Sequence, residues 1–295
     1  MYSFTKPLPL DFLQPIEKCG TVEVLNYISR HYSSHREQNI FKHANIYLPY
    51  GYDKGLRYNV VYLLHGWTGN AEDFVSLKPS KFRNLLDNLV CYKKCLPFIL
   101  VSPTWDCDNV EKEWDESCTE ISCFWEEYIN DLVPAVESKY STFAQYTDIG
   151  NLKKSYEHRV VGGFSMGGIA TWYIFQNIPS VQKYYISMSG ECWDMNNTPS
   201  NEVSNQMLPL IEMMHDLNFQ FYQCVGTKDT RYKKVNDFML SLISKLLESD
   251  KNKFKYILKE NGFHTFRSAW EFIYNVIPAI FPYNSLIDKS NNMNR

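Results

Sequence analysis

The sequence predicts an α/β fold in which a mostly parallel central sheet carries helices on both faces. Short apolar runs alternate with segments of helical periodicity along most of the 295 residues. Two of these runs, 57–66 and 96–105, are apolar almost throughout, which is typical of strands buried on both faces. Two earlier strand-like segments, 20–29 and 43–52, precede any helical segment. We therefore expect these two strands to form an antiparallel N-terminal edge of the sheet.

The remaining elements follow in the order that such a sheet requires. Further strands are predicted at 158–165, 181–190, 219–229 and 253–264. Helices are predicted at 82–94, 125–141, 166–177, 201–217, 230–249 and 266–281. Pro134 falls inside the second of these helices and predicts either a kink or a junction of two short helices, because proline lacks the N–H that a helix interior needs.

The chain reads as one domain with a single interruption. It contains no internal repeat and no linker rich in Gly, Pro or Ser. We therefore expect one large domain, the catalytic domain of any enzyme here, at 19–283, between an N-terminal arm, 1–18, and a tail, 284–295. The segment 106–123 interrupts the pattern as an acidic insertion between a strand end and the next helix. Loops at that place contact substrate in such folds, and a solvated surface loop is the alternative.

Composition excludes several functional classes. The net charge of −3 and the absence of a basic stripe argue against nucleic acid as a partner. No apolar run reaches the roughly 18 residues that a membrane span needs. The start of the chain lacks a signal-peptide pattern, which is compatible with secretion because such a peptide is cleaved from the mature protein.

The eight cysteines form no CxxC pair, and no histidine lies near them at zinc-finger spacing. The sequence therefore predicts no structural metal site. Cys107, Cys118 and Cys123 fall in the acidic segment, where they either form a disulfide or remain thiols.

The stretch RVVGGFSMGGIA, 159–170, places four glycines around Ser165. The spacing Gly163-x-Ser165-x-Gly167 is typical of a nucleophilic serine on a sharp strand-to-helix turn, where neighbours without side chains are needed because backbone segments pass close together. The sequence thus predicts Ser165 as a nucleophile.

Later strand ends supply a base and an orienting acid. Asp229 lies at the end of the strand segment 219–229. His264 lies at the end of the last strand segment, 253–264, and is the only histidine beyond Asp229. This gives the order serine, acid, histidine that a catalytic triad has in open α/β sheets. The alternative role for Asp229 is to cap the helix that follows. Glu191 and Asp194 follow the preceding strand and are expected only to line the pocket.

An oxyanion hole needs two backbone donors. One is expected from the N–H of Met166, which follows the nucleophile. The other is expected from the loop in LLHGWTGN, 63–70, through the N–H of Trp67. His65 opens this loop, and we expect it to brace the loop rather than to act as the base.

Together, the motifs LLHGWTGN, GGFSMGG, MSGECW, VGTKD and NGFH occur in an order that resembles the esterase-D-like carbohydrate esterases of family 1. These α/β-hydrolases are feruloyl and acetylxylan esterases, and the resemblance, over about residues 20–282, is strongest to feruloyl esterases of gut microbes, including anaerobic fungi. It implies Ser165, His264 and Asp229 as the triad, Trp67 and Met166 as oxyanion donors, and no metal or organic cofactor. The acidic segment is longer than the family pattern.

The resemblance also implies a substrate. It points to a secreted enzyme that releases ferulate from arabinose-substituted xylan, with Trp105 and Trp193 either stacking on the feruloyl ring or packing in the core. Three alternatives stay open: an acetylxylan esterase with the same machinery, a thioesterase similar to S-formylglutathione hydrolase, and a catalytically silent fold that binds carbohydrate.

Overall fold

The computed structural model describes residues 2–34, 36–105, 113–192 and 198–283. Its described strands form one nine-stranded sheet in the order β1-β9-β8-β7-β6-β4-β5-β3-β2. The strands are β1 (Tyr2–Phe4), β2 (Thr21–His31), β3 (Arg36–Leu48), β4 (Asn59–Leu64), β5 (Phe98–Pro103), β6 (Arg159–Phe164), β7 (Tyr184–Met188), β8 (Gln220–Gly226) and β9 (Phe254–Lys259).

The predicted sheet is confirmed. The strands β4 to β9 pair in parallel, whereas β2 and β3 form an antiparallel hairpin whose second strand pairs antiparallel with β5. The residues of β4, β5 and β6 are buried throughout, which explains their continuous apolar sequence. One strand was not predicted: β1, only three residues long, pairs in parallel with β9 at the far edge.

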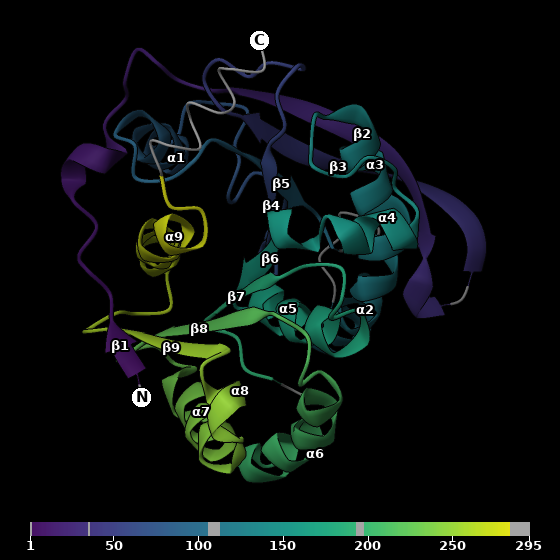
Figure 1. Cartoon of the computed structure of the whole chain (residues 1–295), viewed down its shortest axis with the longest axis vertical. Coiled ribbons are helices and arrows are strands. Elements are labelled where there is room, and N and C mark those ends of the chain that lie inside the picture. Colours follow the sequence, from purple (N-terminus) through teal and green to yellow (C-terminus); the bar gives the residue numbers. More distant parts are fainter. Residues whose placement is uncertain (1, 35, 106–112, 193–197, 284–295) are drawn as a thin grey trace.

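Helices cover both faces of the sheet, as Figure 1 shows. The helices α1 (Lys81–Cys91) and α9 (Phe266–Ile280) pack on one face together with the 3-10 turn η1 (Leu10–Leu13). The other face carries α2 (Trp114–Glu127), α3 (Val133–Lys139), α5 (Met166–Asn177), α6 (Ser200–Met213) and α7 (Tyr232–Lys245). Short helical elements are η2 (Tyr32–Ser34), η3 (Tyr128–Leu132), α4 (Ile149–Lys154), η4 (Tyr156–His158) and α8 (Glu248–Lys251).

The described part, 2–18, of the segment predicted as an arm at 1–18 lies packed against the rest of the fold, chiefly α1 and α9. Leu8, Phe12 and Leu13 are buried in the same core cluster as these helices. The side-chain amide of Asn88 on α1 donates to the carbonyls of Phe12 (3.1 Å) and Gln14 (2.9 Å). The arm is therefore tied down by both apolar burial and hydrogen bonds.

The acidic insertion differs from the expected loop. Residues 106–112, including Cys107, lie outside the described residues, but α2 begins at Trp114 and continues to Glu127. Cys118 and Ile121 are buried on the side of this helix that faces the core, so an amphipathic pattern is present beneath the acidic residues. The expectation of a loop over 106–122 was wrong for its second half.

Pro134 marks a junction between helical segments, one of the two predicted outcomes. A π-helical turn, η3, separates α2 from α3, and Pro134 lies in the first turn of α3. Proline has no N–H to donate and its ring crowds the carbonyl four residues earlier, so a widened turn before it accommodates both effects.

Candidate active site

Ser165 occupies a sharp turn between β6 and α5. The strand ends at Phe164 and the helix begins at Met166, so the serine alone makes the turn, with φ of 57° and ψ of −116°. A positive φ is strained for any residue with a Cβ. The N–H of Ser165 donates to the carbonyl of Met188 at 2.8 Å, which ties the turn to the end of β7.

The glycines around the serine answer a steric demand. A Cβ on Gly163 would lie 2.4 Å from the carbonyl carbon of Gly167, and a Cβ on Gly167 would lie 2.2 Å from the carbonyl oxygen of Leu64. A Cβ on Gly190 would lie 2.5 Å from the carbonyl oxygen of Ser165. Each of these atoms is backbone, so no side-chain movement could relieve the clash. The glycines allow three backbone segments to meet at the serine.

The structure brings Ser165, His264 and Asp229 together. His264 Nε2 lies 2.9 Å from Ser165 Oγ, and His264 Nδ1 lies 2.8 Å from Asp229 Oδ1. Because an ionised carboxylate only accepts hydrogen bonds, the shared proton belongs on Nδ1. Nε2 is then free to accept the proton of the serine hydroxyl. This is the arrangement that activates a serine for nucleophilic attack.

Asp229 combines the two roles that the sequence left open. Its side chain is fully buried, and Oδ1 accepts from the backbone N–H of Arg231 (2.8 Å) as well as from His264. The first bond supports the chain just before α7, as a cap would, and it also fixes the carboxylate toward the imidazole. Glu191, expected only to line the pocket, is ion-paired with the Arg231 guanidinium.

The loop after β4 lies directly beside the serine. A Cβ on Gly66 would approach Ser165 Cβ to 3.3 Å. The N–H of Gly69 donates to the carbonyl of Gly66 at 3.1 Å, and Thr68 has φ of 61°, so the loop forms a tight turn. Met166 is the first residue of α5, where a backbone N–H has no acceptor within the helix. The two expected oxyanion donors thus come from segments that flank Ser165.

His65 is buried beneath this loop. Its Nδ1 lies 2.7 Å from the carbonyl oxygen of Gly66, which places a proton on that nitrogen, and its Nε2 has no hydrogen-bond partner within the described residues. Burial lowers the pKa of His65 to about 4. The imidazole is therefore neutral at ordinary pH. It is positioned to brace the loop, and it is not placed to act on Ser165 as a base in the way that His264 is.

The comparison with known sequences defines the family. Residues 38–273, well over half of the chain, match the family described as "Putative esterase". The chain belongs to this esterase family. Endo-1,4-beta-xylanase Y of Acetivibrio thermocellus is 30% identical over 283 residues, which cover 94% of this chain and 24% of that protein. An endo-1,4-beta-xylanase/feruloyl esterase of Xylanibacter ruminicola is 31% identical over 152 residues, covering 50% of this chain and 19% of that protein. The esterase chain therefore spans a quarter or less of the length of these relatives.

Solved structures agree with the fold. A mutant of the feruloyl esterase module of Clostridium thermocellum, in complex with sinapinate, superposes with a TM-score of 0.80 at 27% identity over 95% of this chain and 94% of that one. A ferulic acid esterase of the anaerobic fungus Anaeromyces mucronatus gives a TM-score of 0.70 at 17% identity over 94% and 97% of the two chains. At 17% identity the likeness shows the fold alone. The predicted α/β-hydrolase fold and the resemblance to family 1 esterases are confirmed.

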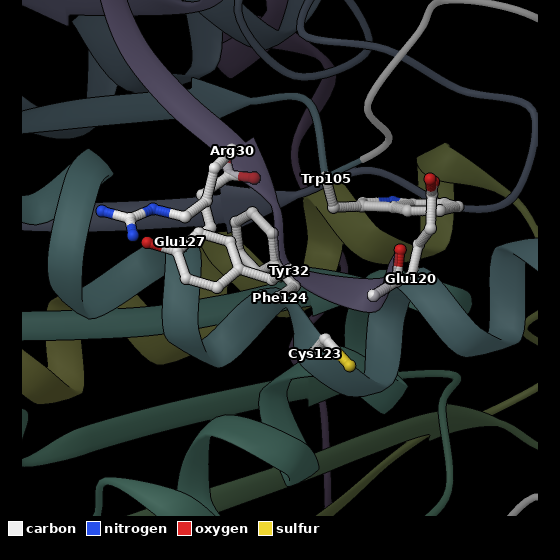
Figure 2. A pocket seen from close by; sticks show the side chains of 8 residues that line it. Arg30, Tyr32, Trp105, Glu120, Cys123, Phe124 and Glu127 are labelled. Carbon is white, nitrogen blue, oxygen red and sulfur yellow. The ribbon is translucent and has the colours of Figure 1, made fainter. Parts of the chain in front are cut away.

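Trp105 is placed behind the esterase's loop rather than in an open pocket. The residue is 3% exposed, its ring stacks on His65 with centroids 5.2 Å apart, and its Nε1 donates to the carbonyl of His65 at 3.1 Å. Figure 2 shows the indole next to Glu120 at one end of a cavity of about 10 Å³, which has room for about one water molecule. The expectation that a feruloyl ring stacks on Trp105 is not supported by this geometry.

Trp67, in the loop beside Ser165, and Trp114, the first residue of α2, form an exposed aromatic pair. Their exposed fractions are 43% and 36%, and their rings meet edge to face with centroids 5.1 Å apart. Trp114 was missed by sequence reasoning, although a tryptophan inside an acidic insertion is itself a signal. Trp193, the other expected stacking residue, lies outside the described residues, as does Asp194.

Several sequence-based expectations of the esterase concern absences. Within the described ranges, no group of three or more His, Cys, Asp or Glu side chains converges as a metal site would require. Among the helices that the structure describes, none is both long and apolar enough to cross a membrane. Cys118 and Cys123 form no disulfide with one another or with any other described cysteine.

Proposed function

We propose that this chain is a feruloyl esterase that hydrolyses the ester between a hydroxycinnamic acid and arabinoxylan. The observation that carries the proposal is the continuous contact from Ser165 Oγ through the His264 imidazole to Asp229 Oδ1, at 2.9 and 2.8 Å. The 27% identical module of Clostridium thermocellum, which was solved with the hydroxycinnamate sinapinate, supports an aromatic acyl group. The xylanase relatives support a xylan substrate.

The first half of the reaction acylates the serine. Ser165 Oγ attacks the ester carbonyl while its proton passes to His264 Nε2, and buried Asp229 stabilises the imidazolium that forms. Negative charge develops on the carbonyl oxygen, where the N–H groups of Met166 and Trp67 donate to it. His264 then returns the proton to the departing sugar hydroxyl, which leaves the feruloyl group esterified to Ser165.

The second half repeats these steps with water. His264 takes a proton from a water molecule, the hydroxide attacks the acyl carbonyl, and the proton returns to Ser165 Oγ as ferulate departs. The proton transfers need no residue beyond the triad, and the two backbone donors stabilise the negative charge. No metal ion or organic cofactor is part of the proposal.

The Trp67–Trp114 pair favours an aromatic acyl group over acetyl. Trp67 follows Gly66, the residue that lies against Ser165, and its indole is exposed. On the sheet, the loop after β4 lies on the opposite side of Ser165 from β8 and β9, which carry the acid and the base. Because His264 protonates the departing alcohol, the acyl group extends away from it, toward the tryptophans. A flat ring gains contact area there that an acetyl group does not.

A substrate panel tests the proposal. We expect kcat/KM for methyl ferulate to exceed that for 4-nitrophenyl acetate after allowance for the better leaving group, and we expect ferulate to be released from arabinoxylan. Trp114→Ala should lower kcat/KM for methyl ferulate about tenfold and leave 4-nitrophenyl acetate unchanged. Release of acetate from acetylated xylan without turnover of methyl ferulate would replace the proposal with an acetylxylan esterase.

Two further outcomes separate the remaining alternatives. Preferred turnover of S-formylglutathione would indicate a thioesterase. Failure of a fluorophosphonate probe to label Ser165 in the folded protein would indicate a silent carbohydrate-binding fold. For the feruloyl esterase we propose action outside the cell, because a polymeric plant cell-wall substrate cannot enter it.

A further inference from the structure

A second cavity opens far from the serine, toward the amino ends of the parallel strands. It has a volume of about 220 Å³ and is lined by Lys18, Tyr47, Tyr50, Asp87, Val90 and Cys91. On β3, Ala44 pairs with Pro103 at the carboxyl end of β5, whereas Tyr47 pairs with Leu100 further toward its amino end. Ser165 follows the carboxyl end of β6. The cavity and the catalytic serine therefore belong to opposite ends of the parallel strands.

The floor of this cavity is a buried carboxylate. Asp87 is only 4% exposed, and its Oδ1 accepts from Tyr47 Oη (2.8 Å) and from the backbone N–H of Gly20 (2.7 Å). No hydrogen bond within the described residues uses Oδ2. Burial raises the pKa of Asp87, and the two bonds to Oδ1 oppose that rise. The two bonds to Oδ1 fix the orientation of the carboxylate. Oδ2 therefore remains as a positioned acceptor for a hydroxyl donor.

The walls supply an aromatic ring, an ammonium group and an apolar surface. Tyr50 is 55% exposed in the turn that follows β3, so a face of its ring is available for stacking. Lys18 contributes a donor, and Val90 and Cys91 at the end of α1 close the other side. Exposed aromatic faces combined with a few fixed polar groups are the chemistry that binds a neutral ring bearing hydroxyls.

We propose that this cavity binds one sugar ring of the xylan chain, as a second carbohydrate site remote from the triad. The inference rests on the proposed function for the identity of the sugar. The volume lies below the roughly 300–1,000 Å³ of pockets that enclose drug-sized ligands, so it admits a single ring. Asp87 accepts from one ring hydroxyl, Lys18 donates to another, and Tyr50 covers the ring face.

The charges on the walls argue against an ionic ligand. A cationic ligand would face the Lys18 ammonium, and an anionic ligand would face the Asp87 carboxylate at the floor. A neutral polyol satisfies both groups. A sugar held in this cavity would keep the polymer attached, while its ester-bearing arabinose branches remain free to reach Ser165.

Two cysteines provide a test with an internal control. Cys91 lines the cavity, whereas Cys19 is also an exposed free thiol but does not line it. Iodoacetamide labelling of the wild-type protein, followed by peptide mass spectrometry, measures both rates with and without xylohexaose. We expect saturating xylohexaose to slow labelling of Cys91 at least threefold and to leave Cys19 unchanged. Equal rates at Cys91 with and without the sugar would overturn the site.

A variant pair separates this site from the active site. Tyr50→Ala should raise the xylohexaose concentration that half-protects Cys91 at least fivefold. Tyr146→Ala, a matched change at a tyrosine that is 61% exposed and does not line the cavity, should not. Turnover of methyl ferulate should be unchanged in both. Turnover without protection of Cys91 would overturn the second site alone, and protection without turnover of any ferulate ester would overturn the proposed function alone.

Discussion

The two ends of β6 differ in backbone strain and in how completely their buried charges are paired. At the amino end, the fully buried guanidinium of Arg159 pairs with Glu137 through Nε (2.5 Å) and Nη2 (2.9 Å). Nη2 also donates to Ser155 Oγ, and Nη1 donates to the carbonyls of Leu152 and Val181. Every guanidinium nitrogen therefore has an acceptor, as a buried charge requires.

At the carboxyl end, strain and incomplete hydrogen bonding are retained. His65 Nε2 and Asp229 Oδ2 are buried without partners among the described residues. Non-glycine residues with positive φ follow four of the strands at this end: Thr68, Ser165, Ser189 and Asn261. Strained backbone persists where the surrounding structure imposes it, and it concentrates at functional sites. The difference teaches that the amino ends of the parallel strands supply stability and their carboxyl ends supply chemistry.

The sharpest test of this division is Ser165→Ala. We expect turnover of methyl ferulate to fall by about four to six orders of magnitude, the scale for removing the nucleophile of a serine hydrolase. The free energy of unfolding should stay equal or rise, because the hydroxyl makes one contact and the strained turn remains. Substrate binding, measured by equilibrium dialysis, should be retained. Residual turnover above about one per cent would show that another group attacks the ester.

A substitution at the amino end of β6 should instead lower stability and spare activity. Arg159→Met leaves the Glu137 carboxylate buried without its cation, and we expect a loss of about 3–5 kcal/mol in the free energy of unfolding, measured by urea titration. The kcat of the protein that remains folded should change less than twofold. Arg159→Met combined with Glu137→Gln should recover part of the loss, because the amide removes the uncompensated charge and keeps one carbonyl oxygen as an acceptor for either Tyr62 or Thr142. A fall in kcat as large as the fall in stability would show that the two ends of β6 are coupled.

The sequence predicted the candidate triad because its signals are local. Glycine spacing around Ser165 reports close backbone approach, and Asp229 and His264 each follow a strand whose apolar pattern marks where it ends. Parallel strands bring their carboxyl ends to one edge, so chain order alone was sufficient to bring the three side chains together.

What the sequence could not predict depends on distant partners. The strand β1 is three residues long and exists because Tyr2–Phe4 pairs with β9, some 250 residues later in the chain. The position of Trp105 after a strand end was evident, but the direction of its ring is set by His65, which lies 40 residues earlier. No periodicity encodes such a contact. Likewise, acidic residues obscured the buried face of α2.

His65, which follows β4, provides a pH-dependent test at the carboxyl ends of the strands. Its pKa is lowered to about 4 by burial, from 6.5 in a model peptide, so the unfolded chain binds a proton between pH 6.5 and 4 that the native state does not. Native stability is therefore full above pH 6.5 and is lost as the pH falls toward 4. This histidine should contribute about 2 kcal/mol of destabilisation between pH 7 and pH 5.

The measurement compares urea unfolding of the wild type and His65→Gln at both pH values. Glutamine does not titrate, so the variant should lose less stability than the wild type on acidification, by about 2 kcal/mol. Identical losses in the two proteins would mean that His65 is protonated in the native state, and that its orphaned Nε2 has found an acceptor.

The smallest effect should come from the brace behind the oxyanion loop. Trp105→Phe keeps an aromatic ring against His65 but removes the Nε1–H that donates to the His65 carbonyl. Loosening the loop by a fraction of an ångström misplaces the Trp67 N–H relative to the carbonyl oxygen, and we expect kcat for methyl ferulate to fall about tenfold with KM nearly unchanged. A substrate-stacking role would instead raise KM for methyl ferulate and spare 4-nitrophenyl acetate. An equal fall in kcat for both esters therefore assigns Trp105 to the loop, and a selective rise in KM would restore it to the substrate site.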